Sequence, residues 1–332
     1  MKIIVDAFGG DNAPAEILKG CELAVNDHSD LELIVTGPEK RIKKAAQENN
    51  IDISRLTVAH CDEILTMDDH AGDVLKKKKN CSMAVGLQML ADGKADAFLS
   101  AGNSGALITG ATLIVKRIKG IKRPAFSPII PKEEGVLMLV DGGANAECKP
   151  EMLRQFAVMG SVYMDKVMKI KNPRVGLANV GTEEHKGDTL RLETFELLKE
   201  TPVNFVGNVE GRDIPMDGCD VLVTDGFTGN LILKTYEGVA AALMRKIKDV
   251  FSKSLKNKLA AAVVLKDMKE LKKSLDHNEY GGAPILGAAK PVFKVHGSAK
   301  AVTVRNAITL TMEYVETNVI AQIAETVSAM NL

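Results

Sequence analysis

Residues 1–14 read MKIIVDAFGGDNAP, and this stretch decides the fold class. Ile3-Ile4-Val5 is a continuous apolar run without alternation, which is typical of a strand buried on both faces. A glycine-rich corner at 6–11 follows, and Pro14 begins a segment whose apolar residues recur at helical spacing. A buried strand, a polar corner and an amphipathic helix in succession indicate an α/β protein with a parallel sheet.

The same succession recurs along the chain. We expect further strands at 31–35, 56–59, 96–99, 136–140, 175–180, 203–206 and 221–223, with helices between most of them. This order predicts a three-layer αβα sandwich with a largely parallel sheet. Residues 121–134 carry three prolines and predict a loop or an edge excursion. The C-terminal third is expected to be helical, with an interruption at 280–297. Because there is no obvious linker or internal repeat, we expect a single domain over residues 1–332.

Composition excludes several classes of function. Lys+Arg and Asp+Glu both total 43, so no net charge attracts nucleic acid, and aromatic residues make up only 4%. The five cysteines are far apart and form no Cys-x-x-Cys pair, which argues against a disulfide framework or a zinc site. We expect neither a signal peptide nor a membrane span, because the apolar runs fall short of ~20 residues. These features predict a cytoplasmic protein without a nucleic-acid partner.

Five glycine-rich corners follow expected strands, at 6–11, 100–105, 141–145, 181–187 and 225–230. In open α/β sheets ligands bind along the carboxyl edge of the strands, and a following helix offers free N–H groups to an anion. Any one corner can be explained by the ordinary need of a strand-to-helix turn for glycine. The five together, each with polar residues, predict an anion site.

Familiar catalytic signatures are missing from the chain. There is no G-x-G-x-x-G after the first strand, no P-loop, no G-x-S-x-G elbow and no H-E-x-x-H. Glycine-lined anion loops without an obvious protein nucleophile favour a reaction in which the anion itself attacks, such as inorganic phosphate on an activated thioester. Positioning alone can supply ~7–11 kcal/mol of the barrier. Lys186 is a candidate phosphate ligand and Asn230 a candidate donor; a solvated lysine and a helix N-cap are the alternatives.

Seven motifs then carry a resemblance: VDAFGGDNAP (5–14), SAGNSGA (100–106), DGGAN (141–145), NVGTEEHKG (179–187), TDGFTGN (224–230), YGGAPILG (280–287) and VHG (295–297). In this order they resemble the bacterial phosphate acyltransferase family (PlsX) over nearly the whole chain. Phe8 and Ser104 replace the more usual Met and Thr, and DGGAN replaces DVGAN.

The resemblance implies an enzyme that transfers a long-chain fatty acyl group from acyl-acyl-carrier protein to inorganic phosphate. The acyl phosphate would serve phospholipid synthesis through a membrane glycerol-3-phosphate acyltransferase. The resemblance also implies a homodimer without metal or organic cofactor. Its fold would be related to phosphotransacetylases and to isocitrate- and isopropylmalate-type dehydrogenases.

We assign the candidate site residues as three groups. The catalytic candidates are Lys186, Asn230 and His296, the last as a proton donor to the leaving thiolate or as a structural histidine. The phosphate-binding candidates are Gly102, Asn103, Ser104, Gly105, Gly181, Thr182, Thr228 and Gly229. The substrate-cleft candidates are Asp6, Gly9, Gly10, Asp11, Asp141, Asn145 and Asp225.

Two surfaces could recognise partners. The basic candidates for docking an acidic carrier protein are Lys76, Lys77, Lys78, Lys79, Arg117 and Arg123, the last two in a cluster expected near Gly102; a plain solvated face is the alternative. Residues 252–276 hold seven Lys against three acidic residues and predict an amphipathic helical segment. Its apolar candidates for an anionic membrane surface are Leu255, Leu259, Val263 and Val264. A helical hairpin or dimer bundle would bury the same stripe, and peripheral contact with the inner face of the plasma membrane stays open.

Three other functions are considered. A short-chain phosphotransacetylase using acyl-coenzyme A would share the chemistry. A metal- and NAD-dependent decarboxylating dehydrogenase would use Asp6, Asp141 and Asp225 as Mg²⁺ ligands, but the dinucleotide loop is missing. A non-catalytic metabolite-binding or membrane scaffold protein would show no phosphate-dependent turnover.

Overall fold

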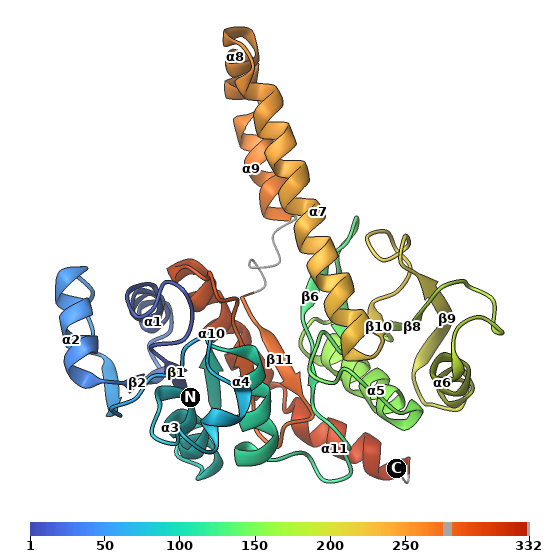
Figure 1. Cartoon of the computed structure of the whole chain (residues 1–332), viewed down its shortest axis with the longest axis horizontal. Helices are drawn as coiled ribbons and strands as arrows, with labels where there is room; N and C mark the ends of the chain where they lie inside the picture. The colour runs from blue at the N-terminus through green and yellow to red at the C-terminus, as the bar shows by residue number, and fades with distance from the viewer. Residues whose placement is uncertain (275–280, 331–332) are drawn as a thin grey trace.

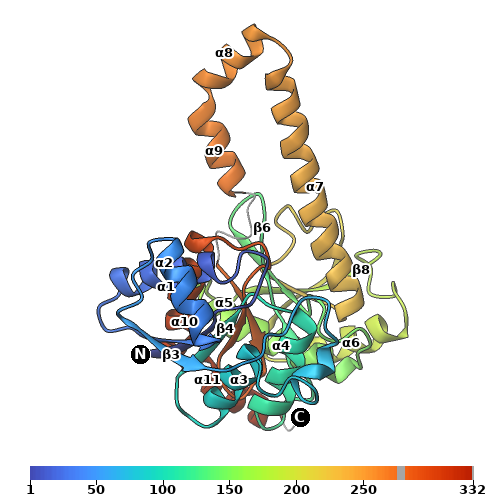
Figure 2. The ribbon, with the colours of Figure 1, turned by 60° about the vertical axis from the view of Figure 1, so that its left-hand side comes forward.

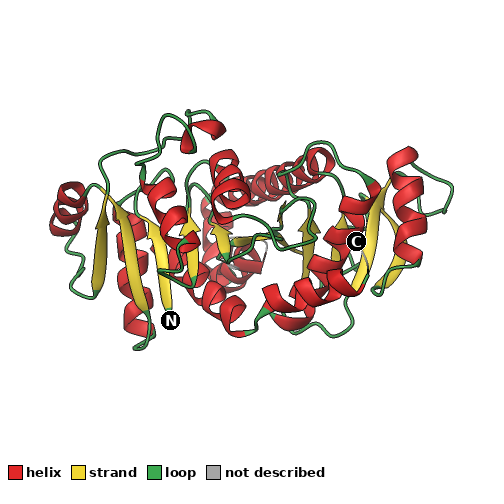
Figure 3. Cartoon of the chain, turned by 90° about the horizontal axis from the view of Figure 1, so that it is seen from below, coloured by secondary structure: helices red, strands yellow, loops and turns green. Residues whose placement is uncertain are grey.

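The computed structural model describes residues 1–274 and 281–330, and its strands form two sheets (Figure 3). The first sheet has the order β3-β2-β1-β4-β12-β11-β5, and the second has the order β6-β7-β10-β8-β9. The strands of the first sheet are β1 (Lys2–Asp6), β2 (Glu32–Gly37), β3 (Leu56–His60), β4 (Ala97–Ser100), β5 (Ala125–Phe126), β11 (Ala283–Leu286) and β12 (Val292–Lys294). Those of the second are β6 (Ile129–Pro131), β7 (Val136–Val140), β8 (Arg174–Asn179), β9 (Asn204–Glu210) and β10 (Val221–Val223).

Helices cover the sheets and extend beyond them (Figure 1). They are α1 (Ala15–Asp27), α2 (Glu39–Glu48), η1 (Ala71–Val74), α3 (Ser82–Ala91), α4 (Ser104–Gly110), η2 (Ala111–Val115), α5 (Pro150–Lys166), α6 (Thr189–Lys199), α7 (Gly226–Ser252), α8 (Leu255–Val263), α9 (Leu265–Ser274), α10 (Ala301–Glu316) and α11 (Val319–Ala329). The expected α/β architecture with largely parallel strands is confirmed. The antiparallel strand pairs are β11 with β12, β11 with β5, and β6 with β7, around the junction of the sheets.

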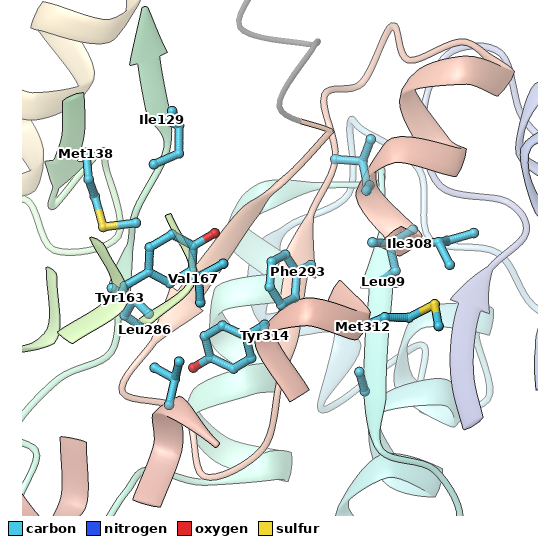
Figure 4. Packing of buried hydrophobic residues seen from close by; sticks show 14 of the residues in the cluster. Leu99, Ile129, Met138, Tyr163, Val167, Leu286, Phe293, Ile308, Met312 and Tyr314 are labelled. Carbon is cyan, nitrogen blue, oxygen red and sulfur yellow. The ribbon is translucent and has the colours of Figure 1, made fainter. Parts of the chain in front are cut away.

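The first strand behaves as its sequence predicts. Ile3 and Val5 point into one apolar cluster, and Ile4 points into another on the opposite face of the sheet; all three are fully buried. The first of these clusters also holds Met138 and Ile129 from the second sheet (Figure 4). One apolar core therefore runs beneath both sheets and holds them together.

Two expectations about the strands need correction. The sequence suggested one sheet, whereas the chain leaves the first sheet at β5, builds the second from β6 to β10, and returns with β11 and β12. The stretch 280–297 was expected only to interrupt helices, but residues 283–286 and 292–294 form these two strands. These strands are too short, and too close to glycines, for their sequences to show the alternation of apolar and polar residues that marks a strand. Residues 121–134 were expected to form a loop or an edge excursion. They contain β5 and β6, each of which is an edge strand of its sheet.

The segment after the second sheet leaves the body of the protein. α7 projects outward, and α8 and α9 return beside it as a hairpin (Figures 1 and 2). The expected helical segment, 252–276, contains α8 and α9, and its last two residues lie outside the described residues. None of the described helices has the length and hydropathy needed to cross a bilayer.

Candidate active site

A cleft of about 330 Å³ lies where the two sheets meet. It is lined by residues of both halves of the fold: Asp11, Met67, Ser104, Ile108, Phe126, Pro128, Ile129, Gly142, Gly143, Asn230, Leu233, Lys234, Glu237, Gly281, Gly282, Ala283, Lys294, His296 and Gly297. Four of the five predicted corners contribute to this lining or support it. Polar groups and apolar side chains therefore share one hollow.

The 6–11 corner is fastened to the neighbouring corners. The Ser100 hydroxyl donates to the Asp6 carboxylate at 2.7 Å, and the Asp11 N–H donates to the Gly297 carbonyl at 2.8 Å. A Cβ on Gly9 would lie 2.5 Å from the Gly102 nitrogen, so glycine is required by this close approach. Burial raises the pKa of Asp6, and its hydrogen bonds oppose that shift. Asp6, Gly9, Gly10 and Gly102 therefore shape the wall, and Asp11 lines the cleft.

The 100–105 corner begins α4. The Asn103 side-chain oxygen accepts from the Ala106 N–H at 3.0 Å as an N-cap, and its amide donates to the Met67 and Asp69 carbonyls. Asn103 thus holds the loop around Met67 against the helix. Ser104 lines the cleft. Gly105 lies instead against η1, where a Cβ on it would be 3.1 Å from the Cβ of Ala71.

The 141–145 corner is organised around one buried carboxylate. Asp141 accepts five N–H donors, from Phe126, Gly143, Ala144 and, twice, Asn145, at 2.6–3.1 Å. Burial raises the pKa of Asp141, and these donors oppose the shift because they favour the charged form. Asp141 and Asn145 therefore hold the turn in shape, and Gly142 and Gly143 form its cleft surface.

The 225–230 corner places Asn230 in the cleft. Asp225, not Asn230, is the N-cap of α7, and its carboxylate accepts from the Thr228 N–H at 2.9 Å. The N-cap alternative for Asn230 is therefore wrong, and its side chain lies beside Gly143 on the cleft wall. A Cβ on Gly229 would lie 1.9 Å from the Asp141 carbonyl oxygen, so this glycine lets α7 pack against the corner.

The fifth corner, 181–187, lies on the other side of α7. A second pocket of about 520 Å³ is lined there by Gly187, Arg191 and Thr228 among others. Residues two positions apart on a helix are rotated by about 200° around its axis. Thr228 and Asn230 therefore point to opposite faces of α7. The Lys186 carbonyl accepts from the Asn179 amide at 3.0 Å, and the Lys186 stem packs on Gly181.

The predicted site is therefore divided in two. Lys186, Gly181 and Thr182 are absent from the lining of the cleft as far as the described residues go. Arg191, which the sequence analysis did not single out, pairs with both Asp188 and Asp225 beside this second pocket.

Lys294 is a candidate functional residue that sequence reasoning missed. It lies at the end of β12, is only 7% exposed and lines the cleft. Its ammonium donates to the Ala101 carbonyl at 3.2 Å and to the Val295 carbonyl. Burial, and then the charge of Lys234, lower the pKa of Lys294 to about 8. A single lysine within the apolar run PVFKV, residues 291–295, was the available signal.

His296 also lines the cleft, with one ring nitrogen held. The Ser298 N–H donates to Nδ1 at 3.3 Å, and the Ser298 hydroxyl lies 2.8 Å from the same atom. Because a backbone N–H can only donate, Nδ1 accepts, and the proton of the neutral ring is on Nε2. The neutral ring can therefore donate a hydrogen bond through Nε2, and the role of His296 in proton transfer stays a prediction.

Comparisons with known proteins now decide the family. A family model described as fatty acid synthesis protein matches residues 1–322. The phosphate acyltransferase of Acetivibrio thermocellus is 46% identical over 325 residues, which cover 98% of this chain and 96% of that protein. That of Bacillus licheniformis is 46% identical over 327 residues, 98% of each chain. The chain belongs to the phosphate acyltransferase family. The resemblance in the seven motifs is thus confirmed, and so is the prediction of an acyltransferase.

Solved structures confirm the fold of this family member. A phosphotransacetylase from Streptococcus pyogenes superposes with a TM-score of 0.64 at 16% identity, over 95% of this chain and 94% of that one. The EutD phosphotransacetylase from Staphylococcus aureus gives a TM-score of 0.60 at 17% identity, with the same coverage. The expected phosphotransacetylase-like architecture is confirmed.

The basic residues predicted to dock a carrier protein separate in this acyltransferase. Lys76, Lys77 and Lys79 are exposed beside η1, while the Lys78 ammonium is held by Asp69 at 2.6 Å and by the Ile64 carbonyl. These lysines follow the Met67 loop, which lines the cleft.

The expectation that Arg117 lies near Gly102 is wrong. Arg123 lies three residues before Phe126, which lines the cleft, so its place beside the cleft stays a prediction. Residues 104–115 are helical and carry the chain about 18 Å away at ~1.5 Å per residue. Arg117 bridges to Ala288, past the end of β11 remote from the cleft.

The aspartates proposed as Mg²⁺ ligands for a dehydrogenase do not gather. Asp6 and Asp141 are each held by their own donors, and Asp225 caps α7 and pairs with Arg191. Across residues 1–274 and 281–330, no three His, Cys, Asp or Glu side chains form a group able to hold a metal ion.

Proposed function

We propose that this chain transfers a long-chain fatty acyl group from acyl-acyl-carrier protein to inorganic phosphate. One observation carries the proposal: the buried Lys294 ammonium opens onto a cleft otherwise rich in apolar side chains, such as Ile108, Phe126 and Leu233. A cavity with a desolvated positive charge beside an apolar wall suits two reactants, an anion and an alkyl chain. Phosphate and a fatty acyl thioester are such a pair.

The reaction needs only positioning and charge stabilisation. A phosphate oxygen attacks the thioester carbonyl carbon, and the carbonyl oxygen becomes an oxyanion. The C–S bond then breaks, the electron pair leaves on sulfur, and the acyl C–O–P bond remains. Lys294 and Asn230 hold the phosphate in this proposal, and Nε2–H of His296 donates a hydrogen bond to the sulfur as negative charge develops there. The proton that the attacking hydrogenphosphate loses ends on the departing thiolate, so the step balances without a proton from the neutral ring.

The alternative is a short-chain phosphotransacetylase that uses acyl-coenzyme A. We favour the long-chain donor because several apolar side chains, including Met67, Ile129 and Leu233, face the same cleft. The test incubates the enzyme with phosphate and one of three donors, palmitoyl-carrier protein, palmitoyl-coenzyme A or acetyl-coenzyme A, and measures acyl phosphate. We expect kcat/KM to be higher with the carrier protein. A preference for acetyl-coenzyme A over both palmitoyl donors would overturn the proposal.

The carrier protein docks, in this proposal, at the exposed lysines Lys76, Lys77 and Lys79. They flank the loop that contributes Met67 to the cleft, and carrier proteins are acidic, so opposite charges would steer the thioester toward the cleft mouth. Because the Lys78 ammonium is engaged within the protein, it is left out of this surface.

We further propose a homodimer. The outer face of α7 carries a stripe of exposed apolar residues at helical spacing: Phe227, Leu231, Val239, Leu243 and Val250. The stripe borders a groove of about 540 Å³ that also contains Ile214 and Pro215. Apolar surface of this extent is favourable to bury against a second copy of the chain.

A last part of the proposal concerns the membrane. Leu255, Leu259 and Val263 at the tip of the hairpin are 75%, 63% and 85% exposed, on a segment rich in lysine. This arrangement supports peripheral contact with the anionic inner face of the plasma membrane by an otherwise cytoplasmic enzyme. There the acyl phosphate would reach a membrane glycerol-3-phosphate acyltransferase and enter phospholipid synthesis. Val264, the C-cap of α8, lies at the same tip and belongs to the proposed membrane contact.

A further inference from the structure

The hairpin carries a pocket of its own, of about 320 Å³, which is open to solvent on one side. Its lining comes from the outgoing helix and the two returning helices. Figure 2 shows how these helices are arranged. The lining consists of Met244, Ile247, Lys248, Phe251 and Ser252 from α7, Lys258 and Ala261 from α8, and Leu265 and Met268 from α9. No residue of this set belongs to the catalytic cleft.

The lining is chemically suited to a hydrocarbon chain. Six of its nine residues are apolar, and two of these are methionines. Methionine has several rotatable bonds and a polarizable sulfur, so it adapts to ligands of irregular or variable shape. A flexible alkyl chain is such a ligand.

Two positive charges share the same cavity. Lys248 and Lys258 both line it, and neither makes an ion pair with an acidic side chain in the part of the chain that the structure describes. The Ser252 hydroxyl donates to the backbone carbonyl of Lys248 at 2.8 Å, so this hydrogen bond does not involve the lysine side chain. An apolar cavity with two ammonium groups matches a molecule that has one hydrocarbon chain and an anionic head.

The cavity continues one face of α7 from the catalytic cleft. Glu237 lines the cleft, and Met244 and Phe251 line the hairpin cavity. Residues seven apart lie on nearly the same face of a helix, so these three form one row. At ~1.5 Å per residue, Met244 lies about 10 Å further along α7 than Glu237.

We propose that the hairpin cavity binds the alkyl chain of the acyl phosphate product after it leaves the cleft, with the phosphate beside Lys248 and Lys258. The proposal rests on the proposed function, since acyl phosphate is the product only if that function holds. The apolar side of the pocket would then cover part of the product chain on its way to the tip.

The test uses the full-length protein and dodecyl phosphate with a photoreactive diazirine at the end of its chain, below its micelle concentration. We expect labelling of peptides between Met244 and Met268, separate from labelling in the cleft. Ala261→Trp fills the cavity and should lower the hairpin labelling at least tenfold. The matched control is Ala262→Trp, whose side chain is exposed and outside the lining. Wild-type protein without hairpin labelling, or labelling that survives Ala261→Trp, overturns the proposal.

A second arm tests the head group. The double variant Lys248→Gln, Lys258→Gln should bind dodecyl phosphate about tenfold more weakly, with unchanged labelling by the matching dodecanol probe. Each methylene added to the alkyl phosphate should tighten binding about fourfold. If dodecanol labels the wild-type hairpin as strongly as dodecyl phosphate does, the phosphate part of the proposal is wrong.

Turnover is measured on the same preparations, so that the two proposals fail separately. Acyl phosphate formation without hairpin labelling overturns the cavity and leaves the proposed function intact. Hairpin labelling without acyl phosphate formation overturns the proposed function and, with it, the assignment of the ligand as product.

Discussion

Replacement of Lys294 by methionine separates the chemistry of the cleft from its stability. Lys294→Met keeps a long side chain of similar volume and removes a positive charge that is buried in the cleft wall. A unit charge about 4 Å from a phosphate oxygen, at an effective dielectric constant of about 20, contributes about 4 kcal/mol. Because the cleft is open to solvent, we expect a somewhat smaller effect. The predicted loss in kcat/KM for phosphate is about 10²- to 10³-fold.

The same substitution should cost little stability. The pKa of Lys294 falls from 10.5 to about 8, so at pH 7 the charged amine disfavours the folded state by about 3 kcal/mol. Methionine removes this penalty and leaves the Ala101 and Val295 carbonyls without their donor, at about 1 kcal/mol each. The Tm should therefore stay close to that of the wild type.

The assay is steady-state acyl phosphate formation at varied phosphate concentration, with Tm measured on the same samples. Lys290→Met is the matched control, because Lys290 lies four residues earlier, donates to the Leu90 carbonyl and lies outside the lining of the cleft. A Lys294→Met enzyme with wild-type kcat/KM for phosphate would refute the reasoning. So would a loss of activity that merely follows a fall in Tm.

The remaining predictions address pH, packing and the two surfaces. Lys294 is charged below its pKa of about 8, so KM for phosphate should rise about tenfold per pH unit above that value, and a flat profile to pH 9.5 would contradict this. Gly229→Ala places a Cβ 1.9 Å from a carbonyl oxygen and should lower the free energy of unfolding by about 3 kcal/mol or more in denaturant melts, whereas Gly238→Ala, in open space, should not. Lys77→Glu should raise KM for acyl-carrier protein severalfold at low salt and less at high salt; an equal KM at low salt would remove Lys77 from the docking surface. Val263→Glu should lose flotation with anionic vesicles, and unchanged flotation would exclude contact through this tip.

Much of the fold was predictable because local rules govern it. Buried parallel strands have continuous apolar runs, and the corner after each strand needs glycine where backbones approach closely, as Gly9 and Gly229 show. The division into two sheets was not predictable in this way. It depends on β5 and β11, which are two and four residues long and pair across about 160 residues of sequence.

The candidate site was predicted in part for a related reason. Parallel strands of one sheet have their carboxyl ends at the same edge, but this rule does not place the corners of two different sheets relative to each other. The sequence also does not tell on which side of α7 the 181–187 corner lies. Lys186 was therefore grouped with Asn230, although α7 separates them. Lys294 was missed because a lysine within an apolar run is most simply explained as a solvent-exposed residue at the edge of a sheet. Only the structure shows that its strand, β12, is buried.

The central claim is that phosphate binds in the cleft beside Lys294. The most direct measurement is a crystal structure of the protein soaked with inorganic phosphate, refined against data good enough to place the ion. The account predicts a tetrahedral density within hydrogen-bonding distance of Lys294 Nζ and the Asn230 side chain. Phosphate bound instead beside Arg191 and Thr228, with the cleft free of the ion, would contradict it.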